Sequence, residues 1–361
     1  MASLDIPAGQ DVRRLKLPLT HGDIAVMCFA AGYAVVAIAL LLATDARQAF
    51  AFRHYLVVWP FVFLMLFPFI YGLLVLLKIV HRIPDRRGRI MALRRAVRHH
   101  HMQPFATGLL LLCCLMVFQG AFTSLKTALP LWCGGFPHDV AQAEIDRALH
   151  FGVDPWRYLT PLGSNRWVHA AIEWNYNQGW FIFCYATLFF VAISARTTAV
   201  RTRYLFTYML TWIVVGNVLA GLFLSAGPVF YEAVTGDSQP FGEQIAFLSS
   251  HGDGPHSVAF LQSYLWQLYK TGNAGFGSGI SAFPSMHVAL ATLNALFIAE
   301  IFPKWRLPAF AYAVLVLVSS VYLAWHYAID GYVAIMVTIA IYAAMKPGFG
   351  RLAIAERRFR V

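Results

Sequence analysis

The sequence predicts an all-α protein, a polytopic bundle of about eight membrane-spanning helices. Of its 361 residues, 59% are hydrophobic and only 12% are charged. Soluble domains contain about 25% charged residues, so the composition departs strongly from theirs. Apolar runs of about 20 residues, long enough to cross a bilayer as a helix, recur along the chain. Together these observations favour one membrane bundle over the two soluble domains that the length would otherwise allow.

Eight apolar runs define the expected helices. The first run is longer than the core of a cleavable signal peptide, so we expect it to be a retained helix. Residues 1–104 then comprise an N-terminal cytoplasmic segment, two helices and a basic cytoplasmic loop. Residues 105–361 comprise the other six helices, two long outer loops and a basic tail. The expected membrane helices are 24–43, 56–78, 105–125, 179–195, 205–226, 286–302, 308–325 and 330–345.

The charge distribution orients this bundle. If the N-terminus lies in the cytoplasm, the cytoplasmic segments contain 21 of the 28 lysine and arginine residues. This is the bias expected of cytoplasmic loops. The basic loop is better explained by contact with anionic lipid than by nucleic-acid binding. We therefore expect a multi-pass integral membrane protein with both termini in the cytoplasm. The cytoplasmic segments are 1–23, 78–104, 196–204, 303–306 and 346–361.

Two long outer loops separate some of these helices. The first, 126–178, contains an amphipathic stretch, AQAEIDRALHFG, and a cluster of tryptophans. Aromatic residues favour the headgroup zone, so this loop is expected to lie on the membrane surface. The second, 227–283, is rich in glycine, serine and proline.

Two histidines and an aspartate are the candidate catalytic residues. His287 lies at the outer start of the sixth helix and His326 at the outer end of the seventh, so the alternation of helices brings both to one membrane face. Asp330 follows His326 by four residues, which places both on one face if the segment is helical. A carboxylate beside an imidazole fixes its tautomer and stabilises its charged form, so His326 is a plausible nucleophile. His287 then suits the role of proton donor, although a structural His–Asp pair at a helix end is the alternative.

The residues before His287 predict the start of a helix. Pro284 and Ser285 are common entry and capping residues. The free N–H groups and the positive dipole end of such a helix form a natural phosphate site. We therefore expect Pro284 and Ser285 to contribute to substrate binding.

The segments FPSMHV and HYAID, 39 residues apart from histidine to histidine, resemble two motifs of the type 2 phosphatidic-acid-phosphatase superfamily. The resemblance implies a catalytic core of six helices. It also implies that His287 is the acid, His326 the nucleophile and Asp330 its assistant. Tyr327, inside the second of these segments, is an expected substrate contact.

The departures from the phosphatase motifs point to one branch of that superfamily. The usual first motif, Lys-x6-Arg-Pro, is absent; Ser320 stands where an arginine is usual, and Met286 where a glycine is usual. This pattern is most similar to the inositol phosphorylceramide synthase branch and less similar to sphingomyelin synthases. The segment LSAGPVFYE resembles a stretch of that branch and makes Tyr231 a further candidate contact, with Ser320, although a simple helix end explains the segment nearly as well.

The loss of basic residues favours a phosphodiester as donor. A phosphate monoester is close to dianionic, whereas a phosphodiester carries one negative charge and loses less when cationic ligands are missing. The argument fails if any basic residue of the outer loops folds over the site. Those residues are Lys126, Arg157, Arg166 and Lys270.

The expected activity is transfer of a phospho-headgroup from a phospholipid to the hydroxyl of a lipid or glycan, through a phosphohistidine and without a metal or cofactor. Water as acceptor would make the protein a lipid phosphatase or phosphodiesterase. The alternative of another class is a lipid transporter or scaffold without catalysis. A bacterial inner membrane with the site facing the periplasm is the expected location, and a Golgi-type membrane with a luminal site satisfies the same topology.

Overall fold

The computed structural model describes residues 19–96, 99–250, 254 and 257–358, and this part of the chain is helical and contains no strand. Seven of its helices are long and apolar enough to cross a membrane, and a shorter apolar helix, α15, is packed among them. The all-α membrane bundle expected from the sequence is therefore confirmed. These helices are α1 (His21–Ala43), α2 to α3 (Phe52–Pro60 and Phe67–Arg82), α5 (His99–Cys133), α8 to α9 (Arg166–Trp174 and Trp180–Ile193), α10 to α11 (Thr198–Ile213 and Ala220–Leu222), α15 (Met286–Ile301), α16 (Arg306–Tyr322) and α17 (Ala328–Arg358).

Several helices extend beyond the apolar runs that predict them. The fourth span begins at Arg166, not at residue 179, because a π-helical turn over Asn175–Gly179 joins α8 to α9. Polar residues in that turn interrupt the apolar pattern without ending the helix. Likewise, α5 continues past the predicted end at residue 125 to Cys133. The extra turns of both helices reach the end of the bundle where the loop helices gather.

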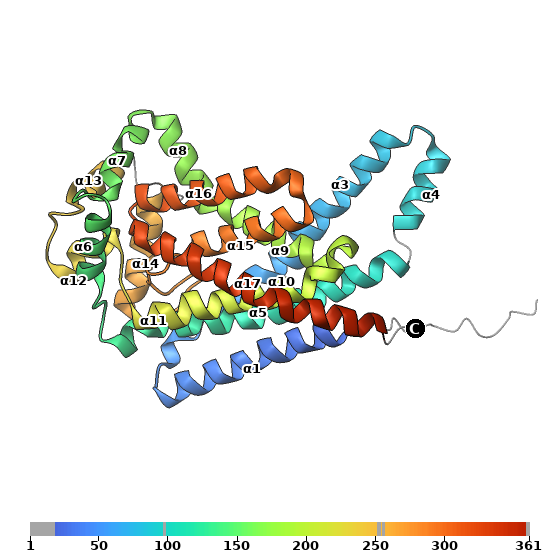
Figure 1. Cartoon of the computed structure of the whole chain (residues 1–361), viewed down its shortest axis with the longest axis horizontal. Coiled ribbons are helices and arrows are strands. Elements are labelled where there is room, and N and C mark those ends of the chain that lie inside the picture. The colour runs from blue at the N-terminus through green and yellow to red at the C-terminus, as the bar shows by residue number, and fades with distance from the viewer. Residues whose placement is uncertain (1–18, 97–98, 251–253, 255–256, 359–361) are drawn as a thin grey trace, which may run out of the picture.

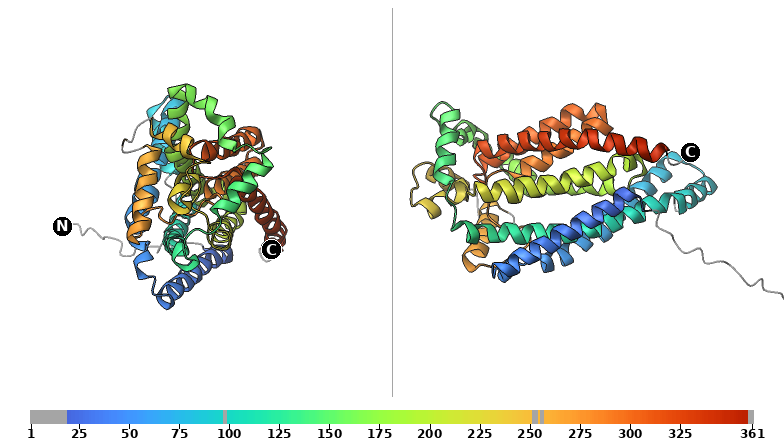
Figure 2. Two further views of the ribbon diagram at one scale, coloured as in Figure 1. Left: turned by 90° about the vertical axis from the view of Figure 1, so that its left-hand side faces the viewer. Right: turned by 60° about the horizontal axis from the view of Figure 1, so that its bottom comes forward.

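The two ends of the bundle differ (Figure 1). Five short helices from the long connections gather at one end, whereas the basic helix α4 lies at the other, where α17 also ends (Figure 2). The long connections are thus folded into helices. The short helices are α4 (Arg86–Ala96), α6 (Asp139–Leu149), α7 (Pro155–Leu159), α12 (Tyr231–Thr235), α13 (Gly242–Ser249) and α14 (Val258–Thr271).

Close packing and buried polar contacts hold the long helices together. A Cβ atom on Gly108 of α5 would lie 2.4 Å from the Ala192 carbonyl oxygen of α9, so only glycine permits this approach. Small residues commonly allow such contacts between membrane helices. Nη2 of Arg201 in α10 donates to both carboxylate oxygens of Asp23 in α1, each at 2.8 Å, and this ion pair is buried. An ion pair therefore holds α1 against the core in addition to its packing contacts.

Candidate active site

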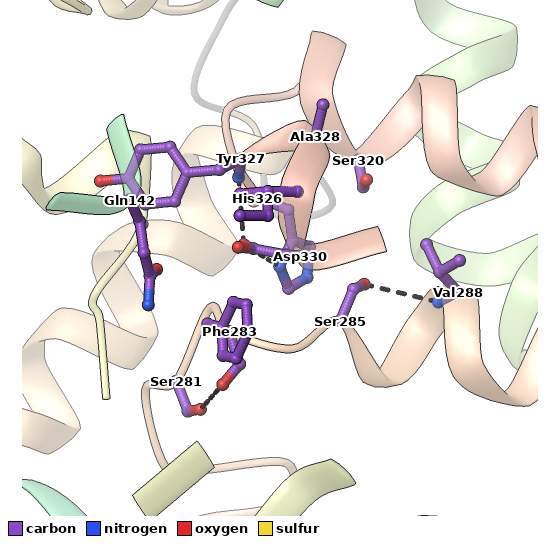
Figure 3. A network of polar contacts seen from close by, with 12 residues as sticks. Gln142, Ser281, Phe283, Ser285, Val288, Ser320, His326, Tyr327, Ala328 and Asp330 are labelled. Atoms are coloured by element: carbon purple, nitrogen blue, oxygen red, sulfur yellow. Dashed lines mark hydrogen bonds and ion pairs between the residues drawn. The ribbon is translucent and has the colours of Figure 1, made fainter. Parts of the chain in front are cut away.

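His287 lies in the first turn of α15. Ser285 precedes this helix, and its Oγ accepts a bond from the Val288 N–H at 3.4 Å (Figure 3). The His287 ring stacks on Tyr176, with centroids 4.5 Å apart, and packs against Trp180 at 4.0 Å. The indole N–H of Trp180 also donates to the His287 carbonyl oxygen at 2.9 Å. Two aromatic rings from the turn between α8 and α9 therefore fix the orientation of the imidazole.

His326 and Asp330 form a buried pair where α16 gives way to α17 (Figure 3). The distance from His326 Nδ1 to Asp330 Oδ2 is 3.1 Å, and the same oxygen accepts the Tyr327 N–H at 3.0 Å. An ionised Asp330 accepts the proton of Nδ1, which leaves the lone pair of the opposite ring nitrogen, Nε2, free to react. The pair thus has the arrangement needed to orient a nucleophilic imidazole.

The two histidine segments are joined by a backbone hydrogen bond. The Ser285 N–H donates to the Asp330 carbonyl oxygen at 3.1 Å, which ties the start of α15 to the start of α17. The rings of His287 and His326 face one another with centroids 6.4 Å apart. A reacting atom about 3 Å from one group and a hydrogen bond of about 3 Å to the other would fill this gap. The two rings are therefore close enough for both to act on one bound phosphate ester.

Both histidines open on one cavity of about 290 Å³. Its wall is rich in aromatic side chains, among them Tyr55 and Phe276. Lys126 of α5 also lies on this wall. The argument for a phosphodiester donor required four basic residues to lie away from the site. Lys126 is one of them, and it lies at the site. The predicted helix ended at residue 125 and left Lys126 in a loop, but α5 continues and turns the side chain toward the interior.

The other three basic residues lie elsewhere. Arg157 pairs with Glu243 at 2.7 Å, and Arg166 packs over the ring of Trp167. Lys270 lies on the wall of a separate cavity. Among the described residues, Lys126 is therefore the one lysine or arginine on the wall of the main cavity.

Burial sets the protonation state of His326. The side chain is shielded from solvent, which lowers the pKa of His326 to about 3, and the positive charge of Lys126 acts in the same direction. The Ala282 carbonyl opposes this shift. Neutral imidazole is therefore the dominant form near pH 7, as a nucleophile requires.

The five expected substrate contacts lie around the site and are absent from the cavity wall. Pro284 and Ser285 are buried at the entry to α15. The Ser320 carbonyl accepts the N–H groups of Trp325 and His326, at 3.0 and 3.3 Å, and so shapes the turn before the nucleophile. Tyr231 and Tyr327 belong to a separate apolar cluster under the loop helices. In this structure these residues support the catalytic segments without lining the cavity.

The helix α6 supplies supporting residues that the sequence analysis missed. Asp139 accepts hydrogen bonds from the N–H groups of Ala226 and Gly227, at 2.7 and 2.8 Å, and from the Tyr327 hydroxyl at 2.8 Å. Asp146 accepts the N–H groups of residues 328 and 329, the first turn of α17, both at 2.9 Å. Burial raises the pKa of both carboxyl groups, and the backbone donors oppose that rise.

A spacing of seven residues places these two carboxylates on one face of α6. Gln142, on the same face, donates to the Phe223 carbonyl at 2.8 Å. The sequence signal was therefore a polar stripe on an amphipathic helix, which we had assigned to the membrane surface. The structure shows that this stripe packs against the loops beside the site.

A metal site is not evident in the described part of the chain, which contains no group of three or more His, Cys, Asp or Glu side chains placed to hold an ion. The candidate chemistry is that of the three residues themselves.

Comparison with known proteins gives one match. A family model described as PAP2 superfamily matches residues 141–344, which is more than half of the chain and includes both histidines and the aspartate. No curated protein and no solved structure matches the chain.

Proposed function

Because this chain belongs to the PAP2 superfamily, we propose that it is a membrane phosphotransferase that moves a phospho-headgroup from a phospholipid to an acceptor hydroxyl. The observation that carries this proposal is the His326–Asp330 pair beside His287 on the wall of one cavity. Membership of the superfamily supports a phosphatase-like enzyme; the transfer reaction, the inositol phosphorylceramide synthase-like branch and the phosphohistidine are part of the proposal.

In the first step, the lone pair on His326 Nε2 attacks the phosphorus of the donor. The bond between phosphorus and the diacylglycerol oxygen breaks, and that oxygen takes a proton from His287. Diacylglycerol leaves, and a phosphohistidine that bears the headgroup remains. Asp330 keeps the Nδ1 proton throughout and stabilises the positive charge that develops on the ring.

In the second step, neutral His287 removes the proton of an acceptor hydroxyl. The acceptor oxygen attacks phosphorus, the N–P bond breaks, and its electrons return to His326. The catalytic residues thereby regain their starting protonation states. The acceptor class that we propose is a lipid or glycan hydroxyl, since the cavity wall is largely apolar.

The position of Lys126 on the cavity wall removes the argument from missing basic residues. A phosphodiester donor stays part of our proposal through the resemblance to the inositol phosphorylceramide synthase branch. A second candidate function, hydrolysis of the same ester, differs only in taking water as the acceptor.

The location proposed for this activity follows from charge. The basic helix α4 and the loop helices beside the site lie at opposite ends of the bundle (Figure 1). Positively charged segments favour the cytoplasmic side. We therefore place both termini in the cytoplasm and the site on the extracytoplasmic face, with a bacterial inner membrane as the proposed setting.

The decisive experiment is a product analysis with purified protein in mixed lipid micelles. Phosphatidic acid and a panel of phosphodiester lipids would be offered with ceramide and diacylglycerol, and the products identified by mass spectrometry. We expect a new phospho-headgroup lipid that disappears in His326→Ala but persists in His54→Ala, a histidine that is not on the cavity wall.

The other outcomes identify the alternatives. Inorganic phosphate from phosphatidic acid alone would identify a phosphatase and refute the proposed transfer. Lipid movement across a vesicle membrane that survives His326→Ala would identify a transporter.

A further inference from the structure

The segment that leads from α16 to His326 contains buried carbonyl groups. The helix ends at Tyr322, and Val321, Tyr322 and Leu323 are each no more than 5% exposed. The last carbonyl groups of an α-helix have no partner within the helix, and a buried carbonyl without a partner is costly. We therefore expect the end of α16 to accept hydrogen bonds from other segments of the chain.

Two buried glutamines supply these hydrogen bonds. The side-chain amide of Gln244 in α13 donates to the carbonyl oxygens of Val321 and Tyr322, at 2.8 and 3.1 Å. The amide of Gln262 in α14 donates to the carbonyl oxygen of Leu323 at 3.1 Å. The two glutamines are only 2% and 6% exposed, so water competes little for these bonds. Two loop helices (Figure 1) thus hold three successive carbonyl groups just before the candidate nucleophile.

The turn that follows these carbonyl groups has a strained backbone. Ala324 has a φ of 59°, a left-handed conformation that is unfavourable for a residue other than glycine. Strained residues persist where the surrounding contacts determine their conformation, and they are frequent at active sites. Here the Ala324 carbonyl accepts the Val229 N–H at 3.0 Å, and Gln262 holds the residue before it. The position of His326, two residues later, therefore depends on contacts from the second outer loop.

Neither glutamine lines the main cavity. Gln244 and Gln262 are absent from its wall, although Leu261 and Leu265, on the same helix as Gln262, belong to it. An effect of the two amides on the reaction would therefore pass through the backbone that carries His326, since they do not face a ligand in the cavity. A substitution of similar volume is expected to leave the cavity wall in place.

We propose that Gln244 and Gln262 are positioning residues for the nucleophile. Their amide groups cap the C-terminal end of α16 and hold the left-handed turn at Ala324, so that the ring of His326 stays aligned with Asp330. The first outer loop acts on the other side of this turn, where α6 bonds the first turn of α17. The short segment that carries His326 is thus held by one outer loop before it and by the other after it.

This inference rests on the proposed function only in taking His326 as the nucleophile, so one of its two measurements needs no turnover. The Nδ1 proton of His326, in its bond to Asp330, should give a low-field NMR signal in detergent micelles, and His326→Gln identifies that signal by its loss. The second measurement is kcat and KM for whichever donor lipid of the mixed-micelle panel gives the most product.

Gln244→Met and Gln262→Met remove the amide donors at nearly constant volume. We expect the His326 signal to shift or broaden, and kcat to fall about 10- to 100-fold while KM changes less than about twofold, because a small displacement of a reacting group suffices for such a loss. Gln262→Glu, which turns an acceptor toward a carbonyl oxygen, should lower kcat further. Gln267→Met, exposed on α14, is the matched control. Asp23→Ala, which removes an ion pair away from the cavity, is the control for a general loss of stability.

The outcomes separate this inference from the proposed function. An unchanged His326 signal or, in an active protein, an unchanged kcat in folded Gln244→Met and Gln262→Met would overturn the positioning role. The same change of the signal in Asp23→Ala would overturn it too. If the methionine variants do not fold, Gln244→Asn and Gln262→Asn, which withdraw the amide by one methylene, take their place, and an unchanged signal in them overturns the role. If the signal responds as expected but the parent protein neither transfers nor hydrolyses any lipid of the panel, the positioning of His326 stands and the phosphotransferase proposal fails.

Discussion

At the scale of single residues, the site depends on how Asp330 controls the ring of His326. The carboxylate is fully buried and holds both Nδ1 of His326 and the Tyr327 N–H through one oxygen. When Asp330 is ionised, this arrangement places the ring proton on Nδ1 and leaves a lone pair on Nε2. No basic residue is needed to orient either histidine. Aromatic rings pack on His287, and the Asp330 carboxylate bonds His326.

Replacement of Asp330 by asparagine tests this control. The change keeps the size of the side chain but removes its charge and permits the wrong tautomer of His326. We expect turnover to fall about 100- to 10,000-fold, as in other enzymes with an orienting aspartate, while the protein still folds. Initial rates in mixed micelles would measure this, with the exposed Glu232→Gln as control; a rate near that of the parent would contradict the assigned role.

The pH dependence of stability tests the burial of His326. Its pKa is about 3 in the folded protein and about 6.5 in an unfolded chain, so the unfolded state binds the extra proton first. Stability is therefore fully present above pH 6.5 and falls as the pH drops toward 3. Between pH 6.5 and 5 we expect a loss of about 2 kcal/mol relative to His326→Gln. Thermal unfolding of both proteins in detergent would measure it, and parallel curves would refute it.

At the scale of elements, α6 forms hydrogen bonds that hold the segments around the catalytic residues in place. Its two buried aspartates hold the start of α17 and the loop at residues 226–227. The first N–H groups of a helix have no partner within the helix, so a carboxylate there satisfies them and interacts well with the helix dipole. Asp330 lies in that first turn. The loop helix thus acts on the site without touching the substrate.

Loss of the Asp146 carboxylate should remove the hydrogen bonds that join α6 to the first turn of α17. In Asp146→Ala, two buried N–H groups lose their partner, and we expect a cost of about 1–3 kcal/mol with a clear fall in turnover. Asp146→Asn, which keeps one acceptor, should lie between it and the parent. The control is Glu144→Ala, exposed on the same helix. Unfolding temperature and turnover would be measured together, and equal behaviour of Asp146→Ala and the control would contradict the proposed role.

At the scale of the whole molecule, the N-terminal helices are joined to the family-matched core both near the cavity and far from it. Tyr55 of α2 and Lys126 of α5 border the cavity. Away from it, Asp23 of α1 pairs with Arg201 of α10. These contacts make the helices before residue 141 part of one bundle with the family-matched core and place them beside the candidate site.

The Asp23–Arg201 pair offers a test of this connection. In Asp23→Ala the guanidinium stays buried without its carboxylate, which typically costs about 3–5 kcal/mol. In Asp23→Ala/Arg201→Leu the unpaired charge is removed too, and we expect most of the stability to return. Unfolding temperatures of the three proteins in one detergent would show this. If the double variant were no more stable than Asp23→Ala, the unpaired charge of Arg201 would not be the cause of the lost stability.

The sequence by itself determined the all-α membrane bundle and the order of its helices, because membrane crossing requires long apolar runs that can be seen in any window of the chain. It also singled out His287, His326 and Asp330, since their helices start or end at one face. The continuation of α5 through Lys126 and the hydrogen-bond partners of the polar face of α6 were decided by tertiary structure alone. Each depends on which side of a helix meets which neighbour, and that contact arises between segments far apart in the chain.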